Sequence, residues 1–447
     1  MTDDFISEYE AHCAVHGRPE RIELLLCDIN AVLRGKWLPG EQAGKLASGE
    51  VRLPLSTYAP NILGAEVEDT GLGIVAGDPD GQLVPVAGTL KPVPWAGGNI
   101  AQVQVEMLTP EGGTSPLSGR ELLARIIGRF AERGLRPVVA TELEFYLLQP
   151  RPCAEAPPEP PALTPDTQNY DMEVLARARP VMAGIVKAAQ AQGLPTDTLV
   201  AEYGPGQFEI NFHHSDDVLA AADTAVLFRR LVRAVAAEHG LEATFMAKPY
   251  AGQPGNGMHV HVSLLDEAGA NIFAAEEGLS EALGAAVAGV LSSMREMQAI
   301  FAPHLNSYRR FGPGSFAPCA PDWGLDNRGA AVRIPRASGP AARLEHRICG
   351  ADANPYLALA AILGGILHGL ESRTPPPPPL GSAPATPARP LHHDWAGAVE
   401  EFAASPLAAE IFGEEFRRIY TAVKRDEIAR ISTLITPVEY KYYLSRL

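Results

Sequence analysis

This chain has few cysteines and no net positive charge. Its 447 residues include five cysteines, an odd number, and none of them forms a Cys-x-x-Cys pair. This pattern argues against a disulfide framework and favours a reducing compartment. Lys and Arg together number 37 against 53 Asp and Glu, which gives a net charge of −16. Because nucleic acids are bound through basic surfaces, this composition argues against DNA or RNA as a partner.

The sequence also lacks a segment of the kind that exports or anchors a protein. Residues 1–10 are acidic and contain no apolar core, so they do not resemble a secretory leader. The longest apolar stretch, residues 356–370, is short and interrupted by glycine, so we expect no helix that spans a bilayer. From these features we expect a cytoplasmic protein without a membrane partner.

Two common nucleotide-binding motifs are missing as well. No GxxxxGK[ST] motif is present, which argues against a P-loop for ATP. The glycines of residues 71–77 are spaced one residue too widely for the dinucleotide motif GxGxxG, and we interpret them as a turn. Any nucleotide must therefore be bound in another way.

The length allows one to three domains, and the residue patterns divide the chain into two. Residues 21–28 predict a buried strand, and residues 30–38 could pair with it as a hairpin. Farther along, residues 119–133 carry apolar side chains on one face, which predicts an amphipathic helix. We therefore predict a small β-rich domain, residues 1–113, and a large α+β domain, residues 114–447.

Four segments of the large domain alternate polar and apolar residues with a period of two, which predicts strands. They are residues 136–148, 206–213, 257–264 and 342–348. For any one of them, a sheet face exposed to water is the simpler interpretation. The polar faces, however, hold Glu, His, Arg, Asn and Gln with a single Ser, whereas exposed strand faces favour Thr, Lys and Ser. Together the four segments predict a cavity lined by polar side chains.

Carboxylates dominate this predicted cavity. With one more from a neighbouring segment they number five: Glu142, Glu144, Glu202, Glu209 and Glu345. Five negative charges cannot share a desolvated site without neutralisation, because like charges and burial both raise carboxyl pKa values. Two divalent cations would supply four positive charges, and nearby arginines the rest. Carboxylates with a single imidazole favour Mg²⁺ or Mn²⁺ over Zn²⁺, and two such ions beside arginines are typical of phosphoryl transfer.

Nine short motifs, in the same order, resemble those of the glutamine synthetase family. They include VATELEF, PGQFE, GMHVH, NSYRR and ANPY, and the nine lie at residues 139–145, 205–209, 248–249, 257–261, 306–310, 327–328, 333–335, 343–345 and 353–356. The resemblance extends from about residue 21 to the C-terminus, and so many ordered motifs make it specific. It is strongest to the branch of γ-glutamylputrescine synthetases and related γ-glutamylamide ligases.

This resemblance implies a fold and an assembly. The fold would be α+β, with a small N-terminal β-grasp domain over residues 1–113. The catalytic domain, residues 114–447, would be a curved antiparallel sheet, or half-barrel, with flanking helices. Family members are rings, so the resemblance also implies a homo-oligomer, a dodecamer of two hexameric rings. In such rings the N-terminal domain of one subunit caps the catalytic domain of the next.

The resemblance also implies the metal and substrate sites. Two or three Mg²⁺ or Mn²⁺ ions would be bound in each site. The implied ligands are Glu144, Glu202 and Glu209 for one metal, and Glu142, His259 and Glu345 for the second. The implied glutamate-binding residues are Arg310 and Arg347, with Gly255, Glu144 and Glu202 beside them. The implied ATP-binding residues are Arg328, Arg333 and Arg343 at the phosphates, with His261 and Ser263 in the nucleotide pocket.

One motif departs from the glutamine synthetases that use ammonia. Those members carry a glutamate in a flap of the form PG-x-E-x-P, whereas residues 312–318 read GPGSFAP, so Phe316 takes the place of the glutamate. Approximate matches also put Pro54 and Pro254 at positions where those members have an aspartate and an asparagine. Losing carboxylates removes the charged cage that ammonium needs. An aromatic ring instead offers an apolar wall, or a cation–π contact to an alkylammonium ion.

These features predict an ATP-dependent ligase that joins glutamate to a primary amine in amine catabolism. Attack of the γ-carboxylate on ATP would give γ-glutamyl phosphate and ADP, and the amine would then displace phosphate. We expect Arg328, Arg310 and Glu202 to be the catalytic groups, Phe316 to border the amine, and putrescine, another polyamine or a small alkylamine to be the acceptor. Two alternatives remain, a true glutamine synthetase that uses ammonia and a non-catalytic binding or structural relative. All six implied metal ligands are present, which argues against the second.

Overall fold

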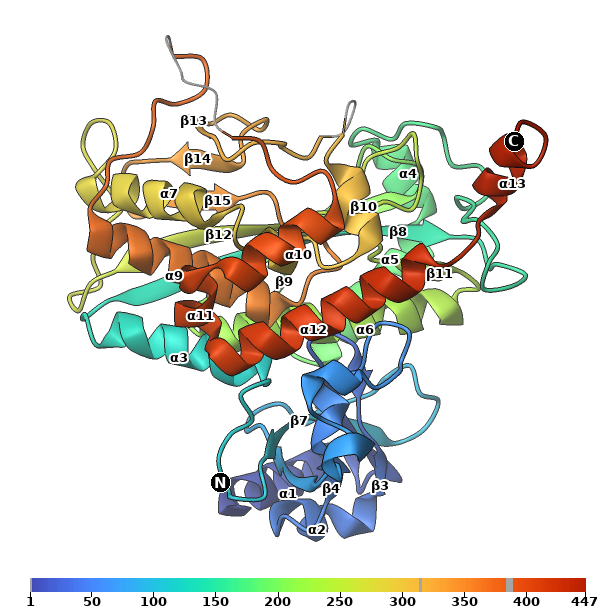
Figure 1. Cartoon of the computed structure of the whole chain (residues 1–447). Helices are drawn as coiled ribbons and strands as arrows, with labels where there is room; N and C mark the ends of the chain where they lie inside the picture. Colours follow the sequence, from blue (N-terminus) through green and yellow to red (C-terminus); the bar gives the residue numbers. More distant parts are fainter. Residues whose placement is uncertain (1, 313–315, 383–388) are drawn as a thin grey trace.

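Two β-sheets with helices around them make up the fold (Figure 1). The computed structural model describes residues 2–312, 316–382 and 389–447. The first sheet contains β1 (Arg21–Cys27), β2 (Leu33–Arg34), β3 (Trp37–Pro39), β4 (Arg52–Pro54), β5 (Asp80–Pro85), β6 (Lys91–Pro92) and β7 (Ile100–Leu108). The second contains β8 (Arg136–Leu148), β9 (Thr196–Ala201), β10 (Gln207–Phe212), β11 (Glu242–Thr244), β12 (Met258–Leu265), β13 (Trp323–Leu325), β14 (Val332–Arg336) and β15 (Arg343–His346).

The helices are distributed over the whole chain. They are α1 (Thr2–His16), α2 (Ala43–Ala47), α3 (Gly119–Ala131), α4 (Met172–Arg177), α5 (Arg179–Ala191), α6 (Val218–Glu238), α7 (Glu281–Ser293), α8 (Gln298–Phe301), α9 (Pro355–Ser372), α10 (Trp395–Ala404), α11 (Pro406–Phe412), α12 (Glu414–Ser432) and α13 (Pro437–Tyr443). The predicted helix over 119–133 is confirmed as α3. It begins after Ser118, whose hydroxyl accepts a hydrogen bond from the Glu121 N–H and so caps the first turn.

The first sheet has the order β2-β1-β7-β5-β4, with β3 paired to β1 and β6 to β7. Strand β1 runs parallel to β7 and antiparallel to β2 and β3. The predicted strand and its hairpin partner are therefore confirmed. Five consecutive residues of β1, 22–26, are buried, which explains why this segment is almost continuously apolar.

The second sheet has the order β13-β14-β15-β12-β8-β10-β9, with β11 paired to β8. Its pairings are antiparallel, as expected, except at one edge, where β13 and β14 run parallel. Residues 326–331 connect these strands, and the first of them, Asp326, has a positive φ of 44° and donates its N–H to Ile334 O. This sheet and its helices confirm the predicted α+β fold class.

Helices cover one face of the second sheet and leave the other face to the polar residues. Phe145 and Phe228 pack edge to face, which joins β8 to α6. Helix α9 is long and apolar enough to cross a membrane, but 78% of it is buried inside the molecule, as in a core helix. Pro355 and the Asn354 cap, which accepts from the Tyr356 N–H, set its start.

The first sheet lies below α6 and α12 in Figure 1, away from β13 and β14. A buried polar cluster joins it to α12. Lys424 Nζ contacts Asn30 Oδ1 at 2.5 Å and Glu427 Oε2 at 3.0 Å, and the Ile62 N–H donates to Glu427 Oε1 at 2.7 Å. The connection between β7 and α3, residues 109–118, includes the predicted boundary at residue 113, which itself stays a prediction.

Candidate active site

Strand register brings the predicted polar residues into rows across the second sheet. The four predicted strands are confirmed as β8, β10, β12 and β15. In one row Glu142 of β8 lies between Asn211 of β10 and His259 of β12. In the next, Glu209 lies opposite Glu144. The side chains thus meet because neighbouring strands present the same face.

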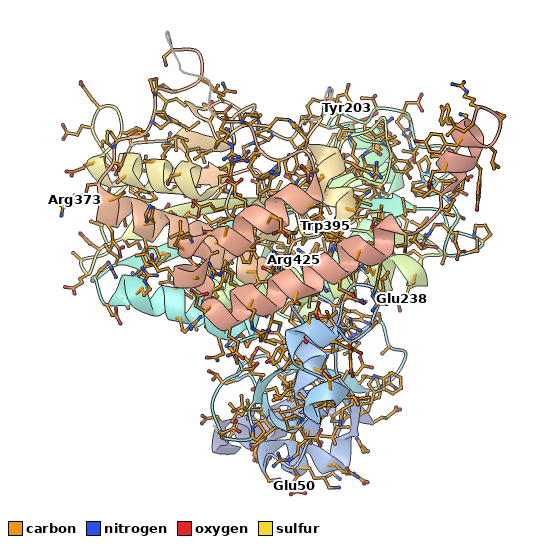
Figure 2. All side chains as sticks on the ribbon, viewed as in Figure 1. Glu50, Tyr203, Glu238, Arg373, Trp395 and Arg425 are labelled. Carbon is orange, nitrogen blue, oxygen red and sulfur yellow. The ribbon has the colours of Figure 1, made fainter. Side chains whose placement is uncertain are left out.

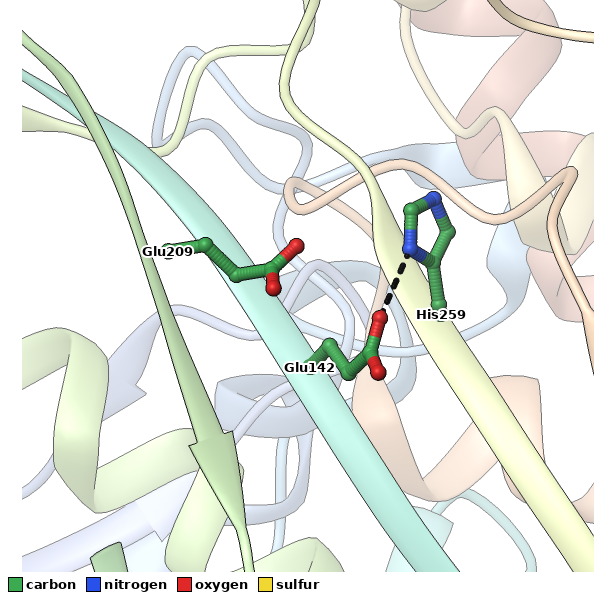
Figure 3. Close-up of side chains that lie close together, drawn as sticks. All are labelled: Glu142, Glu209 and His259. Carbon is green, nitrogen blue, oxygen red and sulfur yellow. Dashed lines mark hydrogen bonds and ion pairs between the residues drawn. The ribbon is translucent and has the colours of Figure 1, made fainter. Parts of the chain in front are cut away.

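Glu142 is the centre of this group. Its Oε2 lies 3.0 Å from His259 Nδ1 and its Oε1 lies 2.9 Å from His261 Nε2, while the Asn211 amide donates to Oε1 at 3.4 Å. Figure 3 shows the carboxyl groups of Glu142 and Glu209 near each other, with the His259 ring bonded to Glu142. Burial opposes ionisation of Glu142, but the hydrogen bonds from the two imidazoles outweigh it and lower its pKa. Glu142 is therefore ionised.

The same contacts define the form of His261. The Arg343 Nε–H donates to His261 Nδ1 at 3.3 Å, so Nδ1 accepts and the ring proton lies on Nε2, where it meets Glu142. Ser263, two residues farther along β12, donates to Ala342 O at 2.8 Å. The structure thus brings together three of the residues expected at the nucleotide: His261, Ser263 and Arg343.

Two other carboxyl groups have raised pKa values. Burial, reinforced by the negative charges of Glu142 and Glu144, raises the pKa of Glu209 to about 10. Burial and the charge of Glu144 raise the pKa of Glu202 to about 7. Glu144 itself is held by the Gly257 N–H, which donates to its Oε2 at 2.6 Å. These carboxyl groups lie close together, with too few positively charged side chains nearby to neutralise them.

Glu345 is buried and paired with two arginines. In the row β12, β15 and β14 it lies between His261 and Arg333. Arg333 Nη1 donates to its Oε2 at 2.8 Å, and Arg347 Nη1 forms an ion pair with its Oε1. Burial opposes ionisation, but the charges of His259 and Arg347 outweigh it and lower the pKa of Glu345.

These residues suit a hard divalent cation. Glu142, Glu209 and His259 have ligand atoms within 4.8 Å of one another, and so do Glu142, His261 and Glu345. The donors are mostly carboxylate oxygens, with few imidazoles, which is the chemistry of Mg²⁺ and Mn²⁺. The raised pKa values of Glu202 and Glu209 point the same way, because a bound cation would supply the missing positive charge.

Arg310, one of the residues expected at glutamate, lies against Gly255. Arg310, at the end of the 3-10 helix η5 (Leu305–Arg310), is 3% exposed and donates to Ile348 O at 2.9 Å. A Cβ at Gly255 would lie 2.5 Å from Ala247 O and 2.7 Å from Arg310 Cγ, so only glycine fits there. The charge of Arg347 acts on Arg310, so the two guanidinium groups are near each other. Arg347 nevertheless pairs with Glu345 here.

Arg328 stands apart from the other arginines. It lies exposed in the loop between β13 and β14, and among the described residues no hydrogen bond or ion pair holds its side chain. Its positive charge acts on Tyr170 and Asp326. The structure therefore does not place Arg328 among the clustered carboxylates of the site.

Phe316 lies next to a residue that the sequence patterns did not identify. Its ring centroid is 5.2 Å from that of Tyr203, at an angle of 68°, and Tyr203 directly follows Glu202. Tyr170 was missed too. The negative charge of Glu202, followed by burial, raises its pKa, which places its phenol near that carboxylate. Both tyrosines lie outside the alternating strands, so the period of two could not reveal them; the adjacency of Tyr203 to Glu202 was the available signal.

Comparisons with known proteins identify the family. Residues 116–443 match the family described as "Glutamine synthetase, catalytic domain". The chain is 39% identical to gamma-glutamylputrescine synthetase PuuA of Escherichia coli (strain K12), over 98% of this chain and 95% of the relative. It is 36% identical to the glutamate–isopropylamine ligase of a Pseudomonas species, over 95% of each chain. A solved structure of a GmaS/ADP complex superposes with a TM-score of 0.85 at 28% identity and covers 97% of this chain and 99% of that one. The chain therefore belongs to the glutamine synthetase family, as an ATP-dependent glutamate–amine ligase.

Proposed function

We propose that this enzyme joins the γ-carboxylate of glutamate to an aliphatic primary amine, either putrescine or a related polyamine or a small alkylamine, and acts in amine catabolism. The observation that carries the proposal is Phe316, an aromatic side chain where ammonia-using members carry a glutamate. The relatives that ligate putrescine and isopropylamine support an organic acceptor. A ring contact suits an alkyl chain, whereas ammonium needs charge.

We propose two metal sites and group their donors as the resemblance implies, although the ligand atoms cluster differently here, as Glu142 with Glu209 and His259 and as Glu142 with His261 and Glu345. We assign one to Glu144, Glu202 and Glu209 and the second to Glu142, His259 and Glu345, with two or three Mg²⁺ or Mn²⁺ ions per active site. Such ions, when bound, neutralise phosphate charge and polarise the phosphoryl oxygens. Because His259 Nδ1 is bonded to Glu142, Nε2 is the ring nitrogen that would accept a metal when the imidazole is neutral.

In the first step, arginines bind glutamate and the phosphates of ATP. Arg310 and Arg347 hold the carboxylates of glutamate, because a planar guanidinium matches a carboxylate with two hydrogen bonds. Arg333 and Arg343 contact the phosphates of ATP beside His261, and Arg328 reaches the transferring phosphoryl group from its exposed loop. The glutamate γ-carboxylate attacks the γ-phosphorus, ADP leaves, and γ-glutamyl phosphate remains.

The second step needs a neutral amine. The amine nitrogen attacks the acyl carbon of γ-glutamyl phosphate, phosphate leaves with the electron pair of the broken C–O bond, and the amine loses a proton. We assign that proton to Glu202, the carboxylate next to Tyr203. The flap residue Phe316 then lies on the side from which the amine arrives.

The assembly completes the site. Figure 2 shows Tyr203 and Glu50 of the N-terminal part at opposite ends of the molecule in this view. We infer a homo-oligomer, a dodecamer of two hexameric rings in the cytoplasm. In it the N-terminal domain, residues 1–113 with Pro54 in β4, caps the catalytic domain, residues 114–447, of the next subunit.

A release assay tests the proposal. ADP formation is measured with glutamate, ATP and Mg²⁺ or Mn²⁺ across ammonia, methylamine, ethanolamine, isopropylamine, putrescine and spermidine. We expect kcat/KM for at least one organic amine to exceed that for ammonia. If ammonia is the best acceptor, the enzyme is a glutamine synthetase and the argument from Phe316 is wrong.

A further inference from the structure

Two large aromatic rings lie exposed and in contact beside the carboxylates. Tyr203 is 39% exposed and Phe316 is 64% exposed, yet their ring centroids are only 5.2 Å apart in an edge-to-face arrangement. The two rings contact each other favourably outside the core, and their exposed parts leave apolar surface open to a ligand. The two residues come from segments more than 100 positions apart, so their contact is a product of the fold.

The backbone around Tyr203 is held firmly. The Gln168 N–H donates to Tyr203 O at 3.1 Å, and the Gln168 side chain donates to Glu202 O at 3.2 Å. On the other side, the Glu202 N–H donates to Gln207 O at 2.9 Å, and the Gly204 N–H donates to Gln207 Oε1 at 3.1 Å. Gln168 and Gln207 are 3% and 1% exposed. The backbone that carries the side chains of Tyr203 and Glu202 is therefore fixed.

The side chain of Tyr146 leaves room only for glycine at residue 204. A Cβ on Gly204 would lie 2.0 Å from the Tyr146 hydroxyl oxygen, so the residue after Tyr203 has no room for a side chain. Tyr146 in turn donates to Pro254 O at 2.9 Å, beside Gly255. The loop that presents Tyr203 is thus packed against the residues expected at glutamate. An amine that attacks glutamate must pass close to this loop.

We propose that Tyr203, together with Phe316, is a specificity-determining residue that binds the alkyl chain of the amine substrate. This inference rests on the proposed function, because it assumes an organic acceptor. The two rings, at 68° to each other, form a corner of apolar surface, and Glu202, the residue before Tyr203, would hold the amine nitrogen beside it. Ammonia has no carbon to fill this corner, so the pair favours alkylamines over ammonia.

The test compares five variants with the wild type. For Tyr203→Ala we expect the ratio of kcat/KM for the best alkylamine to kcat/KM for ammonia to fall about tenfold, as for the loss of one good apolar contact. The loss should lie mainly in the KM for the amine, with little change in the KM for glutamate. Tyr203→Phe keeps the ring and should keep the ratio. Tyr440→Ala removes a tyrosine that is 53% exposed on α13 and should not change it.

The last two variants, Phe316→Ala alone and Tyr203→Ala combined with Phe316→Ala, test the pair. In Tyr203→Ala with Phe316→Ala, the loss should be smaller than the product of the two single losses, because each ring needs the other. An unchanged ratio in Tyr203→Ala, or an equal loss for every amine and for glutamate, overturns this inference but leaves the proposed function intact. A wild type that prefers ammonia overturns the proposed function itself.

Discussion

The substitution Glu209→Gln should have different effects on the metal-free and the metal-bound protein. Glu209 is 8% exposed, and its pKa of about 10 keeps it protonated at pH 7.5 when no divalent ion is bound. Glutamine has nearly the same shape as a protonated glutamate, so without metal the variant should be about as stable as the wild type. Ionising a carboxyl group with this pKa at pH 7.5 costs about 3 kcal/mol, which a bound cation must outweigh.

With Mn²⁺ the two proteins should differ. The wild type offers a carboxylate, whereas the variant offers a neutral amide oxygen, so we expect Mn²⁺ affinity to fall at least tenfold, or about 1.4 kcal/mol. The measurement is the thermal midpoint by calorimetry, with EDTA and with rising Mn²⁺. Glu238→Gln, which changes an exposed carboxylate on α6, is the matched control.

The pH dependence has a definite sign. In the folded protein without metal Glu209 keeps its proton to about pH 10, whereas an unperturbed glutamate loses it near 4.5. Between these values the folded state holds more protons, so the free energy of unfolding falls as pH rises. Mn²⁺ displaces the proton, so stabilisation by Mn²⁺ grows over the same range. A variant that is strongly destabilised in EDTA, or stabilised by Mn²⁺ as much as the wild type, would refute the reasoning.

Three further changes test other parts of the molecule. Lys424→Met leaves Glu427 buried without its ion-pair partner and should lower the free energy of unfolding by about 3 kcal/mol. Calorimetry should show that adding Glu427→Gln restores part of this loss. Equal losses in the single and double variants would contradict the prediction. Phe316→Glu should raise the ratio of kcat/KM for ammonia to that for alkylamine about tenfold, with an unchanged thermal midpoint because the side chain is 64% exposed; a constant ratio argues against a flap role. Glu345→Ala should abolish ADP release while size-exclusion chromatography shows unchanged assembly, and retained turnover would exclude Glu345 as a metal ligand.

Strand positions could be predicted because alternation is a local property. The face that carries Glu142 and Glu144 follows from the period of two alone, and β8 has the predicted bounds. Register is not local. Nothing in the separate segments says that His259 and Asn211 flank Glu142, because hydrogen bonds between distant strands decide which residues lie opposite. The composition of the group was therefore predictable, and its hydrogen bonds were not.

Residues in loops escaped prediction for a different reason. Tyr203 lies after the end of β9 and Tyr170 lies in a turn with a positive φ of 68°, where no periodicity operates. Their positions depend on Gln168, which bonds to the backbone of Glu202 and Tyr203 across the fold. Pairing of Arg347 with Glu345 was also unexpected, since the resemblance places Arg347 at glutamate.

The two predicted metal groups reach neutrality by different routes in the chain without ligands. Glu142 and Glu345 stay ionised because imidazoles and guanidinium groups face them, whereas Glu202 and Glu209 have raised pKa values and hold protons more tightly. If Arg333 and Arg347 turn to phosphate and glutamate, Glu345 loses its partners, and a divalent cation is then the remaining source of positive charge. Binding of the substrates should therefore strengthen binding of the cations, and binding of the cations should strengthen binding of the substrates, because each neutralises charge that the other leaves unbalanced.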